Sequence, residues 1–162
     1  MATQFETLYD IFYKRVVGDS DFFRFKNVPD SEVEGLIKTK AFDYMTESIA
    51  TIFEHSNPEP QIDFNNYDEV LEQFNFDLTK SELQLMANLM FEKFLSRDRA
   101  KLKIYEKYFT TNEINMFSPA QERTSFEKML EHLERKNVKA ILSYNSRDRE
   151  TGALKSYGGA TY

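Results

Sequence analysis

Apolar residues recur at three- and four-residue spacing along much of the first half of the chain, and this spacing is the period of an amphipathic helix. In residues 4–17 one such face is formed by Phe5, Leu8, Phe12 and Val16. A second helix is expected after Pro29, with Asp30 or Ser31 as its N-cap and helical period to about His55. The prolines of the segment 57–60 then end it, because each proline disfavours helical backbone in the residue before it.

The second half of the chain carries two clear helix starts. Thr79–Glu82 (TKSE) has the form of a capping box, in which the Thr79 hydroxyl accepts the Glu82 amide and the Glu82 carboxylate reaches back. An apolar face follows to Leu95, and the stretch after it continues or restarts the helix. The residues SPAQ at 118–121 begin another helix, which either runs to Leu142 or breaks near Asn137.

Two connecting stretches are less regular. We expect a turn and a short extended piece around FFRF (22–25), where four bulky side chains in a row cannot all face one core. One or two of them, Phe22 and Phe23 in particular, are therefore expected on a contact surface. In residues 61–78, QIDF fits a short strand and YDEVLEQFN fits a short helix, and the pattern leaves open which structure forms there.

These patterns together predict an all-α protein, a bundle of about four to five helices. Helical periodicity disappears after Leu142. We therefore divide the chain into a helical body, 1–142, and an extended or hairpin-like C-terminal docking arm, 143–162.

Composition supports one folded domain and narrows the function. The 162 residues are 41% apolar and 15% aromatic, with 15 Phe, 9 Tyr and no Trp, which is enough to build a core. There is no Cys, no stretch resembling a signal peptide, and no run long enough to cross a membrane. The net charge is −6, of which the last twenty residues carry +1 and the body −7. A body of that sign does not attract DNA or anionic lipid through its net field.

Candidate chemistry is sparse, so we expect a protein that is not an enzyme and holds no cofactor and no metal. The two histidines, His55 and His132, stand apart in the sequence without the spacing of a zinc site. Only five glycines occur, and three of them are in the arm, so a glycine-rich phosphate loop is excluded. The carboxylates of residues 63–72 lack the register and the central glycine of a calcium loop.

The arm has the composition of a binding segment. Asp148–Gly152 is predicted to turn the chain between two extended pieces. Arg147 and Arg149 are two residues apart, so on an extended chain they point the same way and can pair with an acidic patch of a partner. The residues predicted to bind a partner are, besides Phe22 and Phe23, Tyr144, Arg147, Arg149, Leu154, Tyr157 and Tyr162.

The helical stretch 118–142 followed by the arm segment 143–157 resembles, in its organisation, the head-to-tail connector (adaptor) proteins of tailed bacteriophages. The likeness covers most of the chain but rests on no diagnostic motif, so no residue role is transferred. It implies a ring of identical subunits in the virion neck, assembled in the host cytoplasm, with the arm docked on a portal-like protein. Tail-side proteins would be further partners, and DNA would pass through the lumen without specific binding, with no membrane involved.

The leading hypothesis from the sequence is thus a non-enzymatic structural subunit of a larger assembly. Deletion of 144–162 is then expected to leave the helical body folded and to abolish assembly. The alternative is a soluble helical assembly chaperone or regulatory module that binds one partner transiently. Copy number in the finished particle separates the two, because a chaperone is absent from it.

Overall fold

The computed structural model describes residues 2–18, 20–56, 61–108 and 120–155. Four long helices build the described part of the chain, together with one short helix, α2 (Ser20–Phe23). The long ones are α1 (Phe5–Val16), α3 (Asp30–His55), α4 (Lys80–Tyr108) and α6 (Ala120–Asn145). The predicted all-α bundle is confirmed.

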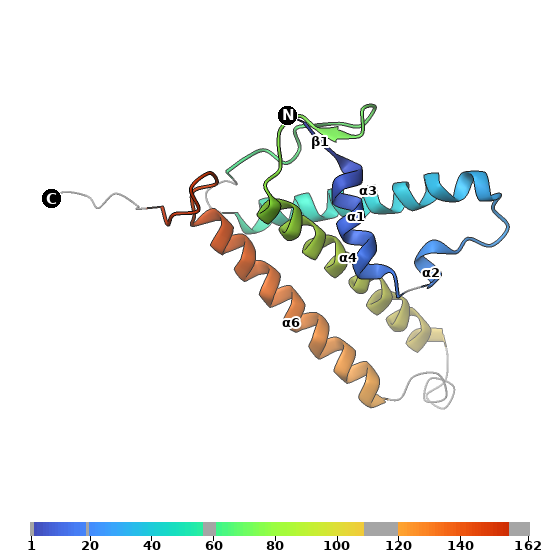
Figure 1. The fold of residues 1–162 in the computed structure, drawn as a ribbon. Coiled ribbons are helices and arrows are strands. Elements are labelled where there is room, and N and C mark those ends of the chain that lie inside the picture. The colour runs from blue at the N-terminus through green and yellow to red at the C-terminus, as the bar shows by residue number, and fades with distance from the viewer. Residues whose placement is uncertain (1, 19, 57–60, 109–119, 156–162) are drawn as a thin grey trace.

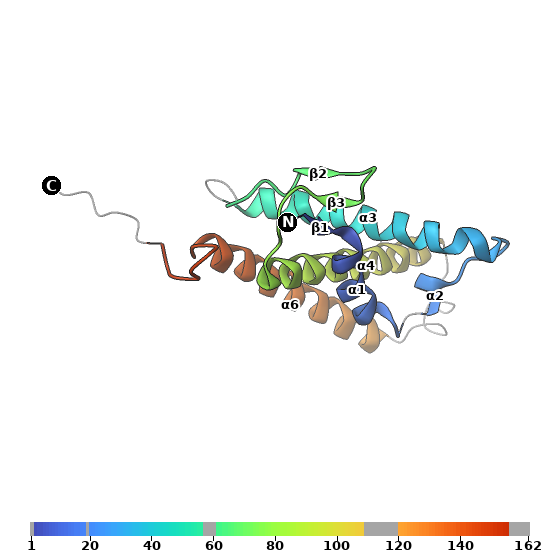
Figure 2. The same ribbon diagram turned by 45° about the horizontal axis from the view of Figure 1, so that its top comes forward.

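The helix α4 is the centre of the bundle. Helices α1 and α3 pack against it, and α6 runs antiparallel beside it (Figures 1 and 2). The core at their junction consists of side chains without exposed surface, among them Leu8, Phe12, Met45, Ile52, Met86 and Leu89. Each such side chain contributes roughly 1.5–3 kcal/mol through burial, so the faces predicted from periodicity hold the fold together.

A small antiparallel sheet covers one end of the bundle. It includes part of residues 61–78, for which the sequence left open whether a strand or a helix forms. Its strand order is β1 (Thr3–Gln4), β3 (Gln73–Phe74), β2 (Tyr67–Asp68). QIDF therefore forms no strand, and YDEVLEQFN forms a β-hairpin instead of a helix. The Asp68 carboxylate accepts the amides of Val70 and Leu71, at 2.8 and 2.9 Å, and this local bonding competes with a helix.

Several helix boundaries differ from the prediction. Helix α3 has Pro29 as its N-cap, with no side-chain cap bond, so Asp30 is its first residue and neither Asp30 nor Ser31 caps it. Helix α4 is continuous from Lys80 to Tyr108. The start predicted at 118–119 lies outside the described residues.

Helix α6 does not break at Asn137. The buried Asn137 amide donates to Glu92 Oε2 at 2.7 Å and to the Asn88 carbonyl at 3.3 Å, so its polar group is satisfied by α4. Helix α6 then continues to Asn145, three residues beyond the predicted end of the body.

Candidate functional site

The start of α4 carries the predicted capping box, and this motif is confirmed. The Thr79 hydroxyl accepts the Glu82 amide at 3.2 Å, and a Glu82 carboxylate oxygen accepts the Thr79 amide at 2.7 Å. Unlike most capping-box carboxylates, which stay near solvent, Glu82 has no exposed surface. A buried carboxylate needs further partners, because an unpaired charge in the interior is very costly.

Those partners come from the opposite end of the chain. The Arg149 guanidinium donates to both carboxylate oxygens of Glu82, at 2.6 and 3.0 Å, and also to the carbonyl of Asp77. The Tyr144 hydroxyl donates to Glu82 Oε1 at 2.6 Å. We call Thr79, Glu82, Tyr144 and Arg149 the Glu82 cluster. It joins α4 to α6 and to the residues that follow α6.

The electrostatics of the cluster favour an ionised Glu82. Burial by itself would raise the pKa of Glu82, but the hydrogen bonds from Arg149, Tyr144 and Thr79 outweigh it and hold the pKa below the ordinary value. Burial and the neighbouring Glu82 carboxylate raise the pKa of Tyr144, so its hydroxyl stays a donor. The hydrogen bond to Glu82 raises the pKa of Arg149. The site is therefore a charge-assisted, multiply bonded ion pair at neutral pH.

Residues 146–155, which we call the C-terminal turn, fold back on the body. The Asp148 amide donates to the Ala153 carbonyl at 2.8 Å, and the Gly152 amide donates to the Asp148 carbonyl at 2.9 Å. Gly152 has a φ of 70°, a left-handed conformation that suits glycine. The Asp148 carboxylate accepts the Thr151 amide at 2.8 Å. The turn predicted at Asp148–Gly152 is present, but one of its flanks is the end of α6 and not an extended piece.

The two arginines of the turn do not point the same way. Arg147 pairs with Leu154 in an isolated β-bridge, and its guanidinium donates to the Gly152 carbonyl at 3.0 Å. Arg149 lies in the turn itself and bonds to Glu82. The expectation of a shared face on an extended chain is wrong, because the tight turn separates the two side chains. The sequence predicts that Arg149 pairs with an acidic patch of another molecule, whereas in the structure it pairs with Glu82 of its own chain.

The other predicted binding residues of the arm have different surroundings. The Tyr144 ring packs against Phe64, with ring centroids 6.4 Å apart, and its hydroxyl is in the Glu82 cluster. Leu154 is 69% exposed. Tyr157 and Tyr162 lie outside the described residues. Of the predicted arm residues that the structure describes, Arg147 and Leu154 are exposed, and Tyr144 and Arg149 are half-buried.

Phe22 and Phe23, the aromatic pair before α3, also differ in their exposure. Phe22 is buried in the core, packed edge-on against Phe12 and Phe94 at 5.6 and 5.8 Å, so its predicted place on the surface is wrong. The short helix α2 turns it inward, where the expected extended piece would not have done so. Phe23 is half-buried and lines a groove at the surface.

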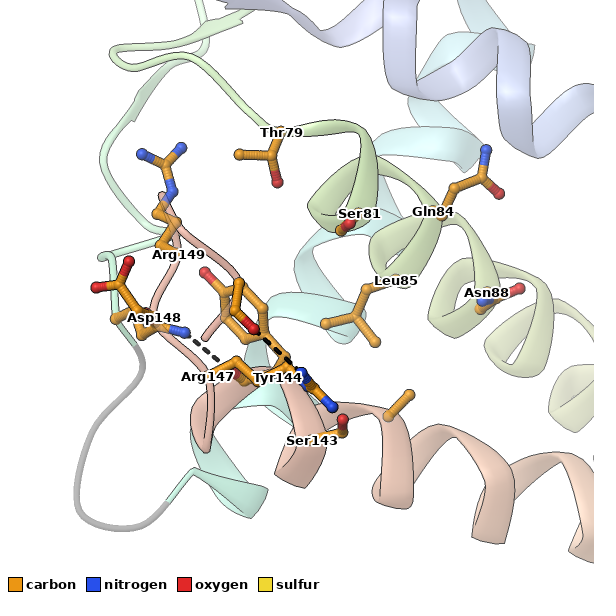
Figure 3. Close-up of a pocket in the computed structure, with 13 residues that line it drawn as sticks. Thr79, Ser81, Gln84, Leu85, Asn88, Ser143, Tyr144, Arg147, Asp148 and Arg149 are labelled. Carbon is orange, nitrogen blue, oxygen red and sulfur yellow. Dashed lines mark hydrogen bonds between the residues drawn. The ribbon is translucent and has the colours of Figure 1, made fainter. Parts of the chain in front are cut away.

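A cleft of about 390 Å³ lies beside the C-terminal turn. Figure 3 shows Arg147, Asp148 and Arg149 on one side of it, facing Thr79 and the first turns of α4, with Ser81 and Leu85. The cleft has a guanidinium, a carboxylate and several hydroxyl groups in reach of a ligand. Its walls are the two segments that the Glu82 cluster holds together.

Glu82 is the functional residue that the sequence reasoning did not connect to the arm. The sequence predicts the capping box, but it places the acidic partner of Arg149 on another molecule, and Glu82 and Arg149 are 67 positions apart in the chain. The available signal is the capping box itself, which places a carboxylate at the start of the central helix.

Other chemistry is limited in the part of the chain that the structure describes. His55 ends α3 and His132 is exposed on α6. Across the described ranges, no three His, Cys, Asp or Glu side chains come together in a group that could hold a metal ion. Among the helices in those ranges, none has an apolar stretch long enough to cross a bilayer.

Comparison with known proteins adds no relative. No family model matches the chain, and neither does any curated protein or solved structure.

Proposed function

We propose that this protein is a non-enzymatic structural subunit of a macromolecular assembly, of the kind found in phage head-to-tail connectors. It docks on a portal-like protein through the C-terminal turn and the residues after it. The observation that carries the proposal is that the Glu82 cluster holds this turn in one geometry while Leu154 remains 69% exposed.

A turn that is already ordered in the free protein favours docking more than a disordered segment would. A segment that is already ordered does not lose its conformational entropy on binding, so more of its contact energy appears as affinity. The Arg149–Glu82 pair supplies that order from inside the body. It leaves Leu154 exposed at the surface, together with the charged side chains of Arg147, Glu150 and Lys155. Aliphatic surface ringed by charge is the usual make-up of a contact site between proteins.

The charge of the body agrees with a role around passing DNA. The helical body carries −7, and the described part of the chain holds no membrane-spanning helix. A negative wall does not retain phosphate groups, which a channel for moving DNA requires. The proposal therefore places the protein in the neck of a virion, with portal-like and tail-side proteins as neighbours.

The decisive experiment is the copy number of this protein in purified native particles, by quantitative mass spectrometry and by symmetry determination. A structural subunit is present in a fixed number per particle. Absence from finished particles would identify an assembly chaperone and overturn the proposal.

Leu154→Ser tests the docking surface directly. Loss of a central aliphatic contact is expected to reduce incorporation into particles about tenfold, which corresponds to 1.4 kcal/mol. Val17→Ser is the matched control, because Val17 is also an exposed aliphatic residue but lies after α1. Both variants should unfold at the wild-type denaturant midpoint. Equal incorporation of the two variants would exclude the turn as the docking surface.

A further inference from the structure

The tip of the β2–β3 hairpin exposes two aliphatic side chains between acidic ones. Val70 is 91% exposed and Leu71 is 58% exposed, and Asp68, Glu69 and Glu72 surround them. We call residues 68–72 the acidic tip. Burying such side chains against a partner removes a large apolar area from water, which makes the tip a candidate contact.

The acidic tip is held rigidly. Asp68 Oδ1 accepts the amides of both Val70 and Leu71 at 2.8 and 2.9 Å. The carbonyl of Glu72 accepts the Phe5 amide at 2.8 Å, which ties the hairpin to the start of α1. The two aliphatic side chains are therefore presented in one position, and little conformational entropy is lost when they are buried.

A groove of about 720 Å³ lies at the junction of α2 and α3. Its apolar lining comes from Phe23, Phe25, Val28 and Val33. Two basic residues, Arg24 and Lys26, also line it, with Asp30 as its single acidic residue. We call this feature the basic groove.

A third cation, Lys40, lies beside this groove, where it also donates to the Phe22 carbonyl at 3.3 Å. The ammonium group of Lys40 lies 4.2 Å from the centroid of the Phe25 ring, close enough for a cation–π interaction. Arg24 and Lys26 together outnumber Asp30, so the lining of the groove carries a net positive charge although the chain carries −6. The apolar lining and the positive charge of the basic groove complement the exposed aliphatic side chains and the negative charge of the acidic tip.

The acidic tip and the basic groove of one molecule do not face each other. The hairpin lies on one side of α3 and α2 lies on the other, in both Figure 1 and Figure 2. We propose that the acidic tip of one copy of this chain docks in the basic groove of a second copy. This contact needs only a second copy, so it goes beyond the assembly role proposed above and does not depend on it.

The geometry makes the contact heterologous, because two different surfaces meet. Each copy keeps an unused tip or groove at its other side, so the contact propagates into chains or closes into a ring. A two-residue knob in a groove buries less area than a stable standard interface. Association is therefore expected to be weak, to rise with protein concentration, and to fall with salt as the charges are screened.

Sedimentation velocity of the full chain over a range of protein concentration and salt tests the contact. A tip variant, V70S/L71S, and a groove variant, R24E/K26E, should each remain monomeric where the wild type associates. An equimolar mixture should form heterodimers only, because one intact tip then meets one intact groove and each partner ends the chain. A wild type that is monomeric up to its solubility limit would overturn the proposal.

Two controls separate the contact from unfolding and from general charge effects. Val17→Ser changes an exposed aliphatic residue outside both surfaces, and Glu127→Lys reverses an exposed charge on α6. Both should associate as the wild type does. Helical circular dichroism of all variants should equal that of the wild type. Association of the tip and groove variants at wild-type strength would assign self-association to other surfaces and refute the proposal.

Discussion

At the scale of single residues, the Glu82 carboxylate links helix capping to the position of the C-terminal turn. It accepts hydrogen bonds from Thr79, Tyr144 and Arg149 and has no exposed surface. Such a group stabilises the fold only while all its partners are present. Loss of one partner leaves a buried charge underbonded, which costs more than the net contribution of the intact pair.

Arg149→Ala is expected to lower the free energy of unfolding by about 3 kcal/mol, because Glu82 then stays buried without its cation. Arg147→Ala is the matched control in the same turn, since the Arg147 guanidinium bonds to an exposed backbone carbonyl. Its cost should be about 1 kcal/mol or less. Urea denaturation followed by circular dichroism measures both. Equal losses in the two variants would show that the ion pair does not contribute as described.

The lowered pKa of Glu82 predicts how this contribution depends on pH. The pKa is lower in the folded than in the unfolded state, so the stabilisation is fully present above the unfolded value, about 4.3. It is lost as the pH falls through the folded value. The difference in unfolding free energy between wild type and Glu82→Gln, about 2 kcal/mol at neutral pH, should therefore stay constant down to about pH 4.3 and shrink below it. A difference that grows on acidification would contradict the predicted direction of the shift.

At the scale of elements, the C-terminal turn belongs to the folded body. Its Arg149 bonds to Glu82 of α4 at 2.6 Å, and the end of α6 just before it is held by the Gln61 side chain, which donates to the Tyr144 carbonyl at 2.7 Å. From the sequence, deletion of residues 144–162 is expected to leave the helical body folded. The structure predicts instead that this deletion destabilises the body. That deletion removes both Tyr144 and Arg149 from Glu82.

Two truncations test this assignment. A chain that ends at Lys155 keeps every contact described above and should unfold at the wild-type midpoint. A chain that ends at Ser143 should lose about 3–5 kcal/mol, the cost of breaking a buried ion pair. Denaturation curves of the two chains, each compared with the full chain, give the result. Equal stability of both truncated chains would return residues 144–155 to the role of an independent arm.

At the scale of the whole molecule, the structure shows three separate surfaces whose positions could not be predicted from the sequence. The C-terminal turn lies at the start of α4, the acidic tip on the hairpin, and the basic groove on the other side of α3 (Figures 1 and 2). The Phe22–Phe25 stretch illustrates the point. Its predicted exposure holds in part for Phe23, whereas Phe22 enters the core between α1 and α4.

The amino-acid sequence by itself determined the positions of most of the helices and the cap of α4. Periodicity and capping are local, so α1, most of α3 and the Thr79–Glu82 box follow from residues within a few positions of one another. The turn at Asp148–Gly152 is local in the same way, because a short polar side chain and a glycine specify it.

Only the tertiary structure decided the pairings between distant residues. The hairpin at 67–74 depends on its register with Thr3–Gln4, and the Glu82–Arg149 pair joins residues far apart in the chain. No local pattern selects among the many carboxylates and arginines of the sequence. The choice is made by burial, because packing α6 on α4 leaves Glu82 without exposed surface and brings Arg149 and Tyr144 within hydrogen-bond distance of it.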